Sequence, residues 1–200
     1  MGFSISWFGF EGKSKAKVLA SFGLRDLGTV DVANEALFSV AELPTGWTIL
    51  FVNDYEFGGD AGVLAEVSAR SRVVACQAEE HMMASAAREY RRGRREWEVV
   101  HDSSYGRDDL AVSGRPSEQL ADIHRRLAAQ NEAQVPDRWP RVDYLFDVPV
   151  ELAERETGFR HDRCRFAWGE PVFTAAESRR VASAQPGTPP WRRAMRFWRR

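Results

Sequence analysis

The chain has 200 residues, of which 44% are hydrophobic and 28% charged, a composition typical of a soluble globular domain. This much apolar material can form a core, which excludes wholesale disorder, and no apolar run is long enough to cross a bilayer. The two cysteines, Cys76 and Cys164, are too few for a disulfide scaffold and too sparse for a zinc ribbon. We therefore expect a cytoplasmic protein.

Charge is distributed unevenly along the chain. Residues 1–80 carry a net charge of −5 and residues 81–170 a net charge of −2, whereas residues 171–200 carry +6. An acidic body followed by a strongly basic end is typical of a separate interaction element. Because the field of the acidic body repels phosphate, nucleic-acid binding would require a local basic patch.

The first part of the chain predicts strands and short helices. Alternating residues over 3–8 predict a first strand, and a helix between Ser14 and Gly23 follows it. Two further strands, 36–42 and 46–53, flank a Pro-Thr-Gly turn, and the second is apolar almost throughout, as in a strand covered on both faces. Asp60 begins another short helix.

Four antiparallel strands are predicted between Arg72 and Gly114, because tight turns separate the extended segments. Their ranges are about 72–79, 81–91, 94–102 and 108–113. Residues 82–90 are rich in Ala, Met and Glu and could be helical by propensity, but we favour the strand.

The last part of the chain predicts two helices and a tail. The longest helix begins at Pro116 and Ser117, a loop covers 130–141, and a final helix runs from Pro149 to Gly158. The predicted fold is a single α+β domain over residues 1–165, with an antiparallel sheet of six to seven strands and four helices packed on it. Residues 166–190 are assigned to a linker and residues 191–200 to a cationic amphipathic tail.

Histidines next to aspartates are the best candidates for catalysis. Imidazole and carboxylate groups together serve metal binding and acid–base chemistry. The candidates are His81, His101, Asp102, His161 and Asp162. No closely spaced ligand pair is present, and adjacent residues of a strand point to opposite faces, so we favour hydrogen bonds that anchor loops as the role of these residues.

Two other motifs lack the spacing that their chemistry requires. Gly12-Lys13-Ser14 lies between a strand and a helix, but the glycine that a phosphate-binding loop needs six residues earlier is replaced by Trp7. Asp54, Glu56 and Asp60 surround a Gly-Gly pair without the spacing of a calcium loop, which indicates an ordinary acidic loop. We therefore predict no cofactor.

Arginines gather in the predicted hairpin around Gly93. Guanidinium groups suit phosphate or carboxylate partners, although charged residues also protect exposed strands from aggregation. The candidate contact residues are Arg88, Arg91, Arg92, Arg94 and Arg95.

The C-terminal end combines one apolar helical face with arginines. Trp191, Ala194, Met195 and Trp198 follow helical spacing, and five arginines occupy the remaining positions. Such a segment can dock on the acidic body of its own chain or be simply disordered, fill a groove of a protein partner, or lie on an anionic membrane or nucleic acid. Ten residues are too few to form a stable helix alone, so order would come from docking.

Four stretches of this sequence resemble small bacterial proteins without an assigned activity. They are Gly46 to Asp54, Glu79 to Met83, Trp97 to Asp102, and Asp147 to Asp162. The resemblance spans about residues 3–163 and implies one bacterial, cytoplasmic domain, with no catalytic residues carried over.

Our leading hypothesis is a non-enzymatic binding protein that acts through surface recognition of a protein partner, for example to neutralise a basic toxin or to join a complex. The charge asymmetry and the missing catalytic spacing support it. One alternative is a metal-assisted hydrolase that uses the His/Asp residues. Another is a nucleic-acid-binding protein that uses the arginine-rich hairpin and the tail.

Overall fold

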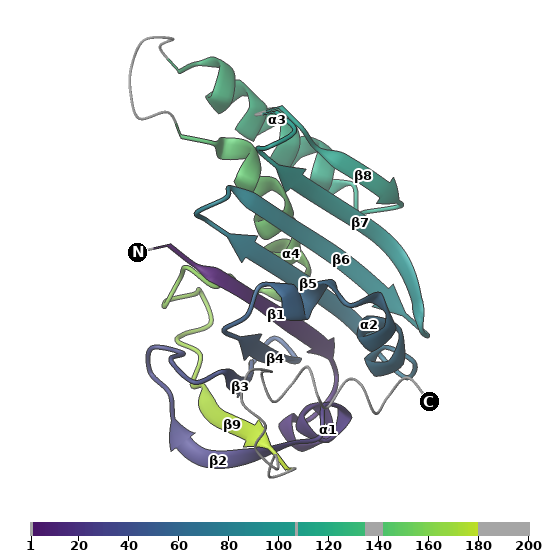
Figure 1. Ribbon diagram of the computed structural model, residues 1–200, viewed down its shortest axis with the longest axis vertical. Coiled ribbons are helices and arrows are strands. Elements are labelled where there is room, and N and C mark those ends of the chain that lie inside the picture. Colours follow the sequence, from purple (N-terminus) through teal and green to yellow (C-terminus); the bar gives the residue numbers. More distant parts are fainter. Residues whose placement is uncertain (1, 107, 135–141, 180–200) are drawn as a thin grey trace, which may run out of the picture.

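The computed structural model describes residues 2–106, 108–134 and 142–179 (Figure 1). These residues form an α+β domain with one antiparallel sheet of nine strands, in the order β2-β9-β3-β4-β1-β5-β6-β7-β8, and four α-helices. The strands are β1 (Ser4–Glu11), β2 (Leu24–Val30), β3 (Phe38–Glu42), β4 (Trp47–Val52), β5 (Arg72–Glu79), β6 (Ala84–Arg91), β7 (Arg94–Asp102), β8 (Ala111–Gly114) and β9 (Thr174–Ser178). The helices are α1 (Lys15–Ser21), α2 (Ala61–Val67), α3 (Gln119–Glu132) and α4 (Asp147–Thr157), with 3-10 helices η1 (Glu56–Gly59) and η2 (Tyr144–Phe146).

Two hydrophobic clusters lie on opposite faces of the sheet. Helices α3 and α4 cover one face, behind the sheet in Figure 1, and pack on Trp7, Cys76 and Val99. Helices α1 and α2 cover part of the other face, where Phe8 and Val73 are buried. The second cluster reaches as far as Tyr90 in β6 and includes no residue of β7 or β8. The face of β7 and β8 on the side of α1 and α2 is therefore left open.

Several local predictions are confirmed. All six residues of β4 are buried, as expected for an apolar strand between two layers. The Asp60 carboxylate accepts hydrogen bonds from the N–H groups of Gly62 and Val63 and so caps α2. Gly158 ends α4 in the left-handed conformation with φ 77°, which glycine adopts without steric cost. Residues 84–91 form a strand, because pairing with β5 and β7 outweighs their helical propensity.

The sequence predicts too few strands and a domain that ends too early. Strand β2 has a single buried residue, so it lacks the apolar alternation that would have indicated it. Strand β9 lies inside the segment 166–190 that the sequence assigns to a linker, and it inserts between β2 and β3. The domain thus reaches at least to Ser178. The remaining part of the predicted linker from residue 180 onward, and the tail, lie outside the described residues.

Within the described ranges, no helix has the length and apolar character needed to span a membrane.

Candidate functional site

His101 is a structural residue in this fold. It faces the α3 and α4 side of β7 and its side chain is fully buried. Its Nδ1 lies 2.6 Å from the carbonyl oxygen of Asp109, and its Nε2 lies 2.9 Å from Oδ2 of Asp143. Both partners are acceptors, so both ring nitrogens donate and the imidazole is positively charged. Burial opposes this charge, but hydrogen bonds to Asp143 and Asp109 outweigh it and raise the pKa of His101.

The other candidate histidines lie in different surroundings. His81 is exposed in the turn after β5, where its Nδ1 lies 3.0 Å from Oε1 of Glu79. His161 lies against Phe3, with its ring edge-on to the Phe3 ring at a centroid distance of 5.0 Å. Neither nitrogen of His161 has a hydrogen-bond partner within the described residues, and burial lowers the pKa of this imidazole to about 4.

The two candidate aspartates also serve separate roles. Asp162 holds the buried Arg160, whose Nε lies 2.6 Å from Oδ1 of Asp162 and whose Nη2 lies 2.6 Å from Oδ1 of Asp147. Asp102 points away from His101, to the open face of the sheet, as alternation along a strand requires. Among the described residues, no group of three His, Cys, Asp or Glu side chains is placed to hold one metal ion. The structure therefore does not bring the candidate catalytic set together.

Three of the five arginines of the hairpin form ion pairs with two glutamates of the same sheet. Arg88 pairs with Glu98 at 2.5 Å, and Arg95 pairs with the other oxygen of Glu98 at 2.6 Å. Arg91 lies 3.1 Å from Glu89. Arg92 and Arg94, at the tip, have no ion pair with another described residue. The tip thus carries less positive charge than the sequence suggests, which weakens the case for phosphate binding. Trp191, Met195 and Trp198 lie outside the described residues.

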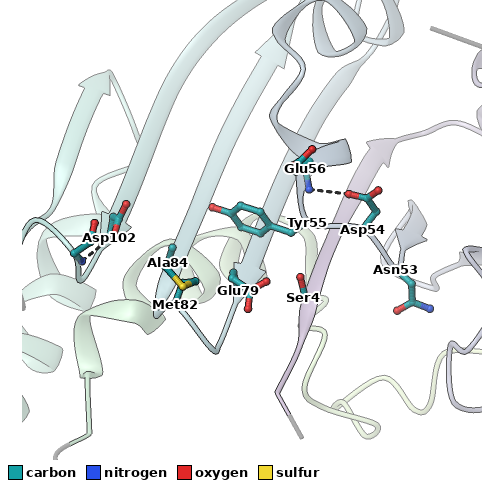
Figure 2. A pocket seen from close by; sticks show the side chains of 10 residues that line it. Ser4, Asn53, Asp54, Tyr55, Glu56, Glu79, Met82, Ala84 and Asp102 are labelled. Carbon is teal, nitrogen blue, oxygen red and sulfur yellow. Dashed lines mark hydrogen bonds between the residues drawn. The ribbon is translucent and has the colours of Figure 1, made fainter. Parts of the chain in front are cut away.

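An open groove of about 740 Å³ lies on the exposed sheet face, at the end where β1 begins (Figure 2). We call it the acidic groove. Ten residues line it: Ser4, Asn53, Asp54, Tyr55, Glu56, Glu79, Met82, Ala84, Asp102 and Ser104. They come from the start of β1, from the segment that joins β4 to the first residue of η1, from the β5–β6 turn with the strand residue on either side of it, and from the end of β7 with the turn that follows. Figure 2 shows the Tyr55 ring lying across the groove between Asp54 and Asp102.

One wall of the acidic groove is fixed by hydrogen bonds to the sheet. Ser6 Oγ donates to the carbonyl oxygen of Asp54 at 2.8 Å, and Gln77 Nε2 donates to the carbonyl oxygen of Tyr55 at 2.6 Å. A Cβ atom on Gly58 would lie 2.7 Å from both Ser6 Cβ and Gln77 Cγ. Glycine at this position therefore lets the wall lie directly on β1 and β5, and the groove exists in the folded chain without rearrangement.

Two carboxylates of the acidic groove, those of Asp102 and Glu79, are stabilised in their charged form. Hydrogen bonds from the side chain and backbone of Ser104 keep the pKa of Asp102 below its ordinary value. Desolvation opposes ionisation of Glu79, but hydrogen bonds from Ser4 and His81 lower its pKa overall. Burial raises the pKa of Tyr55, so its hydroxyl remains a neutral donor. The groove thus combines fixed negative charge with an aromatic ring and the exposed side chain of Met82.

The sequence showed the acidic loop at residues 54–60 but not its juxtaposition with Asp102, because the two lie about fifty residues apart and meet only across the sheet. No family model, curated protein or solved structure matches this chain. The resemblance to small bacterial proteins therefore stays a prediction.

Proposed function

We propose that this protein is a non-enzymatic binding protein and that the acidic groove recognises an arginine- or lysine-rich segment of a protein partner. The observation that carries the proposal is the open sheet face, on which carboxylates surround an aromatic ring and a methionine. Guanidinium groups pair with carboxylates and stack on aromatic rings, so a basic peptide matches both features of the groove. The methionine side chain adapts its shape to apolar side chains of such a peptide.

Two carboxylates of the acidic groove are available for a cationic partner. Asp54 Oδ1 accepts hydrogen bonds from the N–H groups of Glu56 and Phe57, at 2.9 and 3.3 Å, and Asp102 Oδ1 accepts from the N–H of Ser104 at 2.9 Å. Within the described part of the chain, neither carboxylate is in an ion pair with a lysine or arginine. Backbone donors thus fix the orientation of both groups while their charge remains uncompensated.

The test is a titration of a fluorescein-labelled deca-arginine peptide, followed by fluorescence anisotropy. The chain carries its C-terminal arginines replaced by glutamine, so that its own basic end does not compete. Asp54→Asn combined with Asp102→Asn should weaken the Kd about 2- to 30-fold, because each exposed ion pair contributes about 0.2–1 kcal/mol. Asn keeps an oxygen for the backbone donors, so the groove keeps its shape.

The matched control is Glu118→Gln combined with Asp122→Asn. Both carboxylates are exposed at the start of α3, on the other side of the sheet, and their removal changes the net charge equally. The control should bind the peptide like the parent chain. If the two pairs of substitutions weaken binding equally, the attraction is a property of the overall charge, and the groove is not a recognition site.

A further inference from the structure

The C-terminal segment of this chain matches the acidic groove in charge. Residues 191–200 contain five arginines and no acidic residue. The groove carries Asp54, Glu79 and Asp102, and the pKa values of Glu79 and Asp102 lie below their ordinary values. A cationic segment tethered to an anionic surface meets it at an effective concentration in the millimolar range, far above that of a separate partner.

The apolar residues of both elements also match. Trp191, Met195 and Trp198 follow helical spacing in the sequence, so a helix formed by this segment would carry them on one face. In the groove, Met82 is 63% exposed and lies beside Ala84 and the ring of Tyr55. Covering these groups would remove apolar surface from water and stabilise a segment that is too short to form a helix alone.

The connection between the domain and this segment is long enough. Arg179 donates its backbone N–H to Gly23, next to the start of β2. The strand register places this point at the same end of the sheet as the acidic groove, because Ala176 pairs with Phe38, Phe38 with Val52, and Val52 with Ser6. Strands β3 and β4 lie between β9 and β1, so the end of β9 and the start of β1 lie three strand spacings apart, roughly 14 Å across the sheet. The 11 residues between Arg179 and Trp191 can span up to about 40 Å when extended. The segment therefore reaches the groove of its own chain.

We infer that residues 191–200 dock in the acidic groove of the same chain and must be displaced before a partner binds there. This inference rests on the proposed function of the groove and adds its regulation. A segment that fills the groove nine-tenths of the time would weaken the apparent Kd for a competing basic peptide about tenfold. Binding would therefore favour partners that exceed the chain's own segment in charge or apolar contact.

Methyl NMR of the full chain, labelled with ¹³C at the methionine methyls, tests the inference. The chain has four methionines, Met1, Met82, Met83 and Met195, so one signal reports on the groove and one on the segment. We expect a nuclear Overhauser effect between the methyls of Met82 and Met195 at about 50 mM salt, lost at about 500 mM. Met83 packs against the core on the α3 and α4 side and serves as the internal reference.

Variants place the contact at the groove. Replacing the five C-terminal arginines by glutamine, or combining Asp54→Asn with Asp102→Asn, should shift the Met82 signal alike and remove the Overhauser effect. Glu118→Gln with Asp122→Asn should leave both unchanged. A Met82 signal that stays unchanged when the five C-terminal arginines are replaced by glutamine overturns the inference. So does an Overhauser effect that appears only as the protein concentration rises, because the segment would then come from a second copy.

Peptide titration separates this inference from the proposed function. The docking of residues 191–200 and the recognition of basic peptides by the groove are both supported under two conditions. Deca-arginine must bind the chain without its five C-terminal arginines about tenfold more tightly than it binds the wild-type chain, and the groove substitutions must abolish this difference. Equal binding to the two chains, still sensitive to Asp54→Asn with Asp102→Asn, overturns the docking of residues 191–200 and leaves the groove as a recognition site. Binding that is insensitive to the groove substitutions in both chains overturns both.

Discussion

The ion pair between His101 and Asp143 should be the most sensitive polar contact of the core. Replacing His101 by leucine keeps the size of the side chain but removes both hydrogen bonds. The Asp143 side chain is only 8% exposed and would lose the cation that now lies 2.9 Å from its Oδ2. The carbonyl oxygen of Asp109 would also lose its donor.

The size of the effect follows from the charge that the substitution leaves behind. Removing one partner of a buried ion pair costs about 3–5 kcal/mol, because the remaining charge is uncompensated. For a domain of this size, each kcal/mol lowers Tm by about 2–4 °C, so we expect a decrease of roughly 6–20 °C. Asp143→Leu should cost less, since the imidazolium of His101 can lose its proton and become neutral, although the N–H of Leu145 at the start of η2 loses its cap. The double substitution should cost much less than the sum of the two.

Urea unfolding, followed by tryptophan fluorescence between pH 5 and pH 9, measures these free energies. The pKa of His101 is raised in the folded state, so the ion pair contributes its full stability below the unfolded value of about 6.5. That contribution should disappear as the pH rises through the raised pKa, and His101→Leu should abolish this part of the pH dependence. Additive single substitutions, or a pH profile that His101→Leu leaves unchanged, would refute the assignment of a charged imidazole.

Three further predictions concern burial and backbone strain. In the unfolded chain the imidazole of His161 takes up a proton near pH 6.5, whereas in the folded chain it stays neutral down to about pH 4. The free energy of unfolding should therefore fall by on the order of 3 kcal/mol as the pH is lowered through this range. His161→Phe should remove that loss in urea unfolding at pH 4 and pH 7, and an unchanged loss would contradict the assignment. Gly114→Ala should cost several kcal/mol and expose β8 to hydrogen exchange, because its Cβ would lie 2.0 Å from a backbone oxygen of β7 at φ 75°. Gly28→Ala is the control, with φ 69° and nothing within 4 Å of the Cβ, and should cost about 1–2 kcal/mol. Burial raises the pKa of Cys76 to about 12, so iodoacetamide at pH 8 should modify the exposed Cys164 alone, and mass spectrometry of the native protein checks this.

The sequence by itself determined the elements whose signals are local. Tight turns between extended segments predicted β5, β6 and β7, and the apolar run Trp47–Val52 predicted a strand buried on both faces. Capping residues predicted the start of α2 at Asp60 and the end of α4 at Gly158. Alternation along β7 correctly separated His101 from Asp102, because neighbouring strand residues point to opposite faces.

Only the tertiary structure decided which distant segments meet. Strand β9 pairs with β2 about 150 residues earlier, and neither strand carries the apolar alternation that marks burial, because β2 is an exposed edge strand and β9 is short and half-buried. The partner of His101 is Asp143, 42 residues further along the chain, which no local pattern indicates. The acidic groove is likewise assembled from four separate segments across the sheet. Local spacing determines helices, turns and strand faces, whereas pairings across long loops depend on the packing of the whole domain.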